Sequence, residues 1–202
     1  MNLTTINEQL RSKSPEAIVQ WALSIAKRPI VTTNFRPYEA TILHAVSKQL
    51  NDISVIWCDT GYNTRATYEN ARFTIEQLNL NIDLFVPAQT SAYREVVLGI
   101  PEIDTEAHDQ FTKEVKLEPF KRAMATYKPD VWFTNLRKDQ TEFRNNLDIV
   151  SKTKDGVLKI CPFFYWTEEA LNDYLATNRL QSEDNYYDPT KALANRECGL
   201  HT

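Results

Sequence analysis

A lone cysteine near the C-terminal end is the residue of this chain best placed to do chemistry. Cys198 lies in segment 195–202, between Arg196 and His201. The thiolate is the reactive form of a cysteine, and nearby cations favour it. Arg196 and His201 could supply that charge, whereas Glu197 opposes it. Such a thiol could attack a substrate held elsewhere and then meet a second protein; the alternative is a spare thiol on a disordered chain end.

The densest group of basic side chains lies in the middle of the chain, where Arg137, Lys138 and Arg144 are close in sequence. Arginine binds phosphate and sulfate groups in a bidentate manner. Asp139 and Glu142 partly neutralise the cluster, so a solvated basic face is the alternative interpretation.

Three polar segments, 32–38, 59–62 and 135–144, each follow a predicted strand. In open parallel sheets ligands bind beyond the carboxyl ends of the strands, so these segments could converge on one ligand. The candidate binding residues there are Thr32, Thr33, Asn34, Phe35, Arg36, Asp59, Thr60 and Asn135. The helix expected after the first segment would also favour an anion at its N-terminus.

Asp59 has two possible roles. Its carboxylate could accept hydrogen bonds from a ribose or an adenine amine, or it could cap the helix expected from Thr64. The other two cysteines, Cys58 and Cys161, lie in apolar segments and are predicted to be small buried side chains at strand ends.

Strand and helix patterns alternate along the chain. Strands are expected at 30–33, 53–58, 82–86, 131–134 and 158–161, and helices from Ser14 and at 37–50, 64–78, 92–98, 119–127 and 167–176. This alternation predicts a single α/β domain, with a parallel sheet and helices on both faces.

The chain of 202 residues is expected to divide into an N-terminal helical segment (1–28), a nucleotide-binding core (29–178) and a flexible catalytic C-terminal tail (179–202). The net charge of −4 argues against nucleic-acid binding. No apolar stretch approaches the length of a membrane span, and residues 1–11 do not form a secretory signal. We therefore expect a cytoplasmic protein.

Several of these segments match one known family in the right order. The tail sequence Glu-Cys-Gly-Leu-His at 197–201 resembles the ending of the assimilatory sulfonucleotide reductases, the PAPS reductase family. Segments 32–39, 59–62, 116–119 and 136–141 also match, followed by Arg144. The resemblance extends from about residue 29 to 201. It implies the PP-loop type of fold, which is similar to the adenine-nucleotide alpha-hydrolases.

The resemblance also implies a reaction. Cys198 would attack the sulfate sulfur of 3′-phosphoadenylyl sulfate, and adenosine 3′,5′-bisphosphate would leave. Reduced thioredoxin or glutaredoxin would then release sulfite from a Cys198 thiosulfonate. The resemblance places this reaction in sulfate assimilation and cysteine biosynthesis. The family is typically homodimeric. By this resemblance Lys116, Arg137 and Arg144 would bind the anionic groups of the sulfonucleotide, and Arg196 and His201 are expected to add positive charge beside Cys198.

Two matches to the family are incomplete. Arg36 stands where better-known members have a small residue, and His108 matches a histidine found in some members but would by itself be read as a surface residue. Members that reduce adenylyl sulfate often hold a four-iron cluster on four cysteines. Here the place of the Cys-Cys pair holds Phe111 and Thr112, and the chain has three cysteines. We expect no bound metal or cofactor.

Three alternatives remain open from the sequence. The chain could reduce adenylyl sulfate without a cluster. It could be an ATP pyrophosphatase that adenylates a substrate, although the first loop lacks the glycines that such enzymes use. It could also be an adenine-nucleotide binding module without activity.

Overall fold

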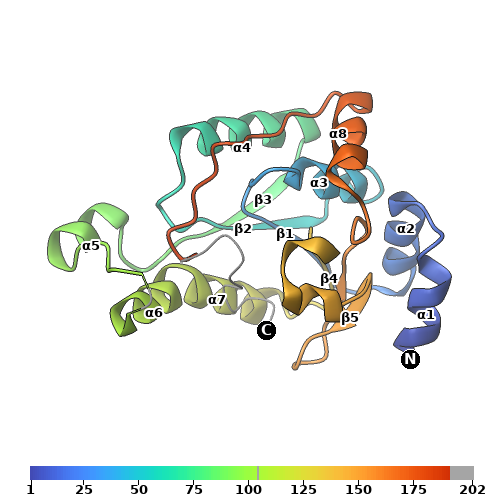
Figure 1. Cartoon of the computed structure of the whole chain (residues 1–202), viewed down its shortest axis with the longest axis horizontal. Helices are drawn as coiled ribbons and strands as arrows, with labels where there is room; N and C mark the ends of the chain where they lie inside the picture. Colours follow the sequence, from blue (N-terminus) through green and yellow to red (C-terminus); the bar gives the residue numbers. More distant parts are fainter. Residues whose placement is uncertain (104, 192–202) are drawn as a thin grey trace.

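A six-stranded sheet in the order β3-β2-β1-β4-β6-β5 forms the centre of the computed structural model, which describes residues 1–103 and 105–191 (Figure 1). The strands are β1 (Pro29–Thr33), β2 (Ser54–Cys58), β3 (Asn81–Phe85), β4 (Val131–Phe133), β5 (Val150–Lys152) and β6 (Leu158–Ile160). The first four and β6 run parallel, and β5 pairs antiparallel with β6. The single α/β domain and the five predicted strands are confirmed.

The strand β5 was not predicted. It has three residues, of which only Val150 is buried, so it carries too little alternation to be recognised. Its register with β6 pairs Val150 with Ile160, and a tight turn at Gly156 joins the two strands.

Eight α-helices surround the sheet in the described residues. They are α1 (Leu3–Leu10), α2 (Pro15–Ile25), α3 (Glu39–Ser47), α4 (Arg65–Leu78), α5 (Ser91–Val97), α6 (Glu106–Thr112), α7 (Glu118–Tyr127) and α8 (Glu168–Thr177). A π-helical turn, Lys113–Leu117, joins α6 to α7, and 3-10 turns lie at Lys138–Gln140 and Glu142–Asn146. None of the helices in this part of the chain is long and apolar enough to cross a membrane.

The helix ends follow from capping residues. Ser14 accepts a hydrogen bond from the backbone N–H of Ala17, with Pro15 at the first helical position, and Thr167 caps α8 in the same way. The prediction for α3 was two residues too early at its start. Tyr38 adopts a left-handed conformation with φ of 68°, which α-helical backbone excludes, so the helix begins at Glu39.

Helices α1 and α6 were also missed from the sequence. α1 is short and polar, and its position depends on a contact with the far end of the chain. The Asn7 side chain is buried, donates to the carbonyl of Val150 at 2.9 Å and accepts from its N–H at 2.8 Å. The amide of Asn7 therefore completes the open edge of β5.

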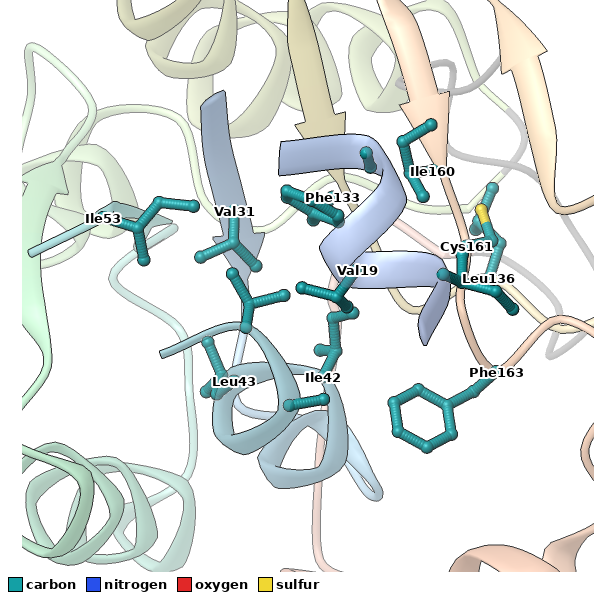
Figure 2. Packing of buried hydrophobic residues seen from close by; sticks show 14 of the residues in the cluster. Val19, Val31, Ile42, Leu43, Ile53, Phe133, Leu136, Ile160, Cys161 and Phe163 are labelled. Atoms are coloured by element: carbon teal, nitrogen blue, oxygen red, sulfur yellow. The ribbon is translucent and has the colours of Figure 1, made fainter. Parts of the chain in front are cut away.

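Alternate residues of the central strands fill two apolar cores, one on each face of the sheet. Val31 and Phe133 point to the face covered by α2, α3 and α8, where they pack near Val19 and Ile42 (Figure 2). Ile30 and Trp132 point to the opposite face, against α7. The expectation of helices on both faces is confirmed.

The first part of the segment after α8 packs against the rest of the domain. Residues 179–191 run beside α4 and then turn toward α6 and α7 (Figure 1). Glu183 accepts from Thr67 of α4 at 2.8 Å, and Asp188 and Thr190 are buried. Sequence periodicity missed this packing because, after the buried Leu180, polar side chains rather than an apolar face attach the segment. Residues 192–202, with Cys198, lie outside the described part.

We predict that Asn7→Ala lowers the free energy of unfolding by about 1–3 kcal/mol, because it leaves the N–H and carbonyl of Val150 without their partner. Urea denaturation measures the change. The matched control is Gln9→Ala on the exposed side of the same helix, which should change stability by less than about 0.5 kcal/mol. Equal effects of the two substitutions would contradict the role of Asn7.

Candidate active site

A cavity opens at the carboxyl ends of β1, β2 and β4. Its volume is about 650 Å³ when space open to solvent is included. It is lined by Thr32, Thr33, Asn34, Arg36, Glu39, Ile56, Cys58, Lys116, Phe120, Trp132, Thr134, Arg144 and Lys191. This is the edge of the sheet where the sequence predicted a ligand.

One wall of the cavity is apolar. Ile56, Phe120 and Trp132 belong to the core between the sheet and α7. The indole N–H of Trp132 donates to the hydroxyl of Thr32 at 2.8 Å, which fixes the ring beside β1. The wall therefore offers flat apolar surface next to the polar loop after β1.

The loop after β1 is shaped by side chains because it contains no glycine. Phe35 adopts φ of 53°, is buried, and packs edge-on against Trp57 with ring centroids 4.8 Å apart. Its N–H donates to the hydroxyl of Thr33 at 3.0 Å. Phe35, a predicted binding residue, thus belongs to the core beneath the loop, while Thr33 and Asn34 line the cavity.

Arg36 is held against the cavity by two acceptors. Its Nε donates to Oε1 of Glu39 at 2.9 Å, and its Nη2 donates to the carbonyl of Asn135 at 2.8 Å. Burial raises the pKa of Glu39, although the guanidinium groups of Arg36 and Arg144 act in the opposite direction. The Asn135 amide in turn donates to the carbonyl of Tyr38 at 2.9 Å, which joins the loops after β1 and β4.

Positive charge predominates in the cavity. Arg36, Lys116, Arg144 and Lys191 all line it, and Glu39 is the one acid among the described lining residues. Arg144 is 3% exposed and donates to the side-chain carbonyl of Gln140. The cavity is therefore suited to a ligand with several negative charges.

Lys116 lies on the π turn and contacts the C-terminal segment. Its ammonium donates to Oδ2 of Asp188 at 2.5 Å and to the hydroxyl of Thr190 at 3.1 Å. Burial acts to raise the pKa of Asp188, but the charge of Lys116 and the hydrogen bonds from Lys116 and Thr190 hold that pKa below its ordinary value. This segment also brings Lys191 to the cavity.

The interpretation of Asp59 as a helix cap is wrong, because Thr64 caps α4. Asp59 accepts hydrogen bonds from the Gly61 N–H at 2.9 Å, from the Asn63 amide at 2.8 Å and from the Tyr68 hydroxyl at 3.0 Å. Asp59 and Thr60 do not appear among the residues that line the cavity.

Arg137 also lies outside the cavity lining. Its guanidinium stands over the Tyr38 ring at 5.1 Å and pairs with Glu168 at 3.4 Å. The remaining predicted residues, Arg196, Cys198 and His201, lie outside the described part of the chain.

Several residues of the site and its surroundings were not predicted from the sequence. Trp132 carries no motif, Glu39 ends the matching segment 32–39 but was not singled out, and Lys191 was not singled out within the tail. His108 was read as a surface residue, which is wrong: it is 2% exposed, and its Nε2 lies 3.0 Å from the carbonyl oxygen of Pro189. The burial of His108 depends on its contact with Pro189, 81 residues further along the chain, and no local sequence pattern indicates that contact.

The described residues contain no group of three or more histidine, cysteine or acidic side chains that could hold a metal ion. The two cysteines in this part of the chain are separate. Cys58 is half-buried at the cavity, and Cys161 is buried in the core.

Comparison with known proteins gives a consistent result. Residues 28–188 match the family model described as the phosphoadenosine phosphosulfate reductase domain. Proteins named phosphoadenosine 5′-phosphosulfate reductase are similar over almost the whole chain. The one from Erwinia tasmaniensis is 33% identical, covering 100% of this chain and 92% of the relative. The one from Cronobacter sakazakii is 34% identical, covering 98% and 91%.

Solved structures share the fold. A phosphoadenylyl-sulfate reductase from Candida auris, in complex with phosphate, superposes with a TM-score of 0.77 at 22% identity, covering 89% of this chain and 87% of the other. A U34-tRNA thiolase from Methanococcus maripaludis gives a TM-score of 0.62 at 13% identity, covering 89% and 67%. The PP-loop type of fold expected from the sequence is thereby confirmed.

We predict that Cys58 and Cys161 resist alkylation in the native protein. Burial raises the pKa of each thiol to about 12. At about pH 8 roughly one thiol in ten thousand would then be ionised, against about a quarter for an ordinary cysteine. Iodoacetamide labelling followed by peptide mass spectrometry tests this. The control is the same protein in denaturant, and rapid native labelling of Cys58 would contradict the prediction.

Proposed function

The chain belongs to the phosphoadenosine phosphosulfate reductase family, and on that premise we propose that it reduces 3′-phosphoadenylyl sulfate to sulfite and adenosine 3′,5′-bisphosphate. The observation that carries the proposal is the cavity with four cations and one acid beyond the carboxyl ends of the strands. The phosphate and sulfate groups of this substrate need such a surplus of positive charge.

The walls of the cavity suit the two ends of a sulfonucleotide. Ile56, Phe120 and Trp132 offer an apolar surface for the adenine. The guanidinium groups of Arg36 and Arg144 can each donate to an oxyanion, whereas Lys116 and Lys191 act as point charges. The hydroxyls of Thr32 and Thr33 and the amide of Asn34 add neutral hydrogen-bonding groups.

The nucleophile that we propose is Cys198. Cys58 also lines the cavity, but a thiol with a pKa of about 12 supplies little thiolate at neutral pH. Cys198 follows Lys191 by seven residues, and seven extended residues span at most about 25 Å. That length is sufficient for Cys198 to reach a ligand in the cavity.

The reaction would proceed in two stages. The Cys198 thiolate attacks the sulfate sulfur, an S–S bond forms, the S–O bond to the nucleotide breaks, and adenosine 3′,5′-bisphosphate leaves. A thiolate of reduced thioredoxin or glutaredoxin then attacks Sγ of Cys198 and releases sulfite. The second thiol of that donor closes the donor's own disulfide and restores Cys198.

We also propose that the enzyme is a homodimer. Six apolar side chains on α5 and the loop after it are more than half exposed: Tyr93, Val96, Val97, Leu98, Ile100 and Ile103. Several exposed apolar side chains within one short segment favour an interaction site, and we propose that a second copy of the chain covers them.

We predict that Cys198→Ser abolishes sulfite release but leaves nucleotide affinity within about threefold, because the cavity that binds the nucleotide is formed by other residues. Cys58→Ser is the matched control, since it alters the other thiol near the ligand, and it should retain turnover. Sulfite release with reduced thioredoxin measures the effect. Loss of activity in Cys58→Ser with full activity in Cys198→Ser would reverse the assignment.

The same assay identifies the substrate and the donor. Sulfite is measured from 3′-phosphoadenylyl sulfate and from adenylyl sulfate at one salt concentration, with thioredoxin or glutaredoxin supplied. Turnover of the phosphorylated nucleotide alone agrees with the proposal, and turnover of adenylyl sulfate alone would overturn it.

A further prediction concerns Arg144. Arg144→Gln should weaken the binding of adenosine 3′,5′-bisphosphate by about ten- to a hundredfold, as expected for loss of a charge-assisted contact of about 1.5–3 kcal/mol. Lys27→Gln removes the same charge from an exposed position far from the cavity lining, and should have little effect. Calorimetric titration at fixed salt compares the two, and equal small losses would mean that the nucleotide does not bind beside Arg144.

A further inference from the structure

Lys116 forms an ion pair with Asp188, an acid that does not line the cavity. Lys116 lines the cavity, whereas Asp188 and Thr190, which accept hydrogen bonds from its ammonium, are absent from the lining. The side chains of Lys116 and Asp188 are only 7% and 3% exposed. The carboxylate therefore contacts the ammonium without occupying ligand space.

Asp188 is held in place independently of Lys116. Its Oδ1 accepts hydrogen bonds from the Thr190 N–H at 3.1 Å and from the Thr190 hydroxyl at 2.6 Å. The next residue, Pro189, is fixed through its carbonyl oxygen, 3.0 Å from Nε2 of His108. A carboxylate fixed in this way can set the position of a flexible lysine, rather than follow it.

The charges around Lys116 make that carboxylate necessary. Burial disfavours the ammonium form, and nearby cations disfavour it further. In the part of the chain that the structure describes, the groups around it are Asp188 from the C-terminal segment, the Cys58 thiol from β2 and, around the cavity, Arg36, Glu39, Arg144 and Lys191. Glu39 pairs with Arg36, and among the described residues Asp188 forms the ion pair with Lys116.

We propose that Asp188 is a positioning residue: it keeps Lys116 charged and directed into the cavity, where the ammonium binds an oxyanion of the ligand. The assignment of that oxyanion to a sulfonucleotide rests on the proposed function. The action of Asp188 on Lys116 does not, and it can be tested with a simple anion.

The test is calorimetric titration of inorganic sulfate into the full-length protein. Sulfate keeps its two charges between about pH 6.5 and about pH 9.5, so any pH dependence of its affinity arises from the protein. Asp188→Asn keeps the size of the side chain and removes its charge. Asp184→Asn makes the same change at an exposed position of the same segment and serves as the control.

We expect Asp188→Asn to bind sulfate within about threefold of the wild type at the acidic end, and about ten- to a hundredfold more weakly at the alkaline end, where Lys116 loses its proton. Asp184→Asn should follow the wild type throughout. Parallel profiles for the two variants, or an equal loss for Asp188→Asn at every pH, would overturn the proposal, because a purely structural role predicts no change in the profile.

A second variant covers the case in which Asp188→Asn does not fold. Thr190→Val removes the hydroxyl that contacts both Lys116 and Asp188 without changing charge, and it should weaken sulfate binding by roughly threefold at the alkaline end. Unchanged affinity in a folded Thr190→Val protein would count against the proposal. Absence of sulfite release by the wild type would refute the proposed function, while the sulfate titration would still decide the role of Asp188.

Discussion

Removing a cation from water is costly unless an opposite charge, a hydrogen-bond acceptor or an aromatic face accompanies it. Lys116, Arg94 and Lys159 are each less than a tenth exposed, and each has such a companion. Asp188 contacts Lys116, Glu114 accepts from Arg94 at 2.5 Å, and the ring of Trp132 lies 5.3 Å from Lys159. Since Asp188 is 72 residues from Lys116, the cavity acquires its charge only when distant parts of the chain have packed together.

The loop after β1 meets a second constraint, because it must turn sharply without glycine. Phe35 and Tyr38 take positive φ values, which costs about 1–3 kcal/mol for each such residue. Burial of Phe35 against Trp57 and the ion pair of Arg36 with Glu39 offset that strain. Glycine-rich loops bind phosphate through backbone N–H groups; here, side chains such as Arg36 and Asn34 are presented to the cavity instead.

The sequence was informative where the signal is local. Apolar β-branched runs located the parallel strands, and capping residues such as Ser14 and Thr167 located helix starts. The edge of the sheet that bears the cavity followed from topology alone. Contacts between distant residues could not be read in this way. The pairing of Asn7 with Val150, 143 residues apart, and the burial of His108 beneath Pro189 have no counterpart in periodicity or spacing.

The π turn has a consequence for how this chain can vary. Helix α6, the turn and α7 form one continuous helical stretch over 106–127, and the turn closes i→i+5 hydrogen bonds, one residue wider than those of an α-helix. Each residue of an α-helix adds about 100° of rotation. Losing one residue here would regularise the helix but rotate His108 relative to Phe120, so that they could not both keep their present neighbours. Substitutions on the outer face of this stretch can be accommodated, whereas the insertion or deletion of a residue cannot.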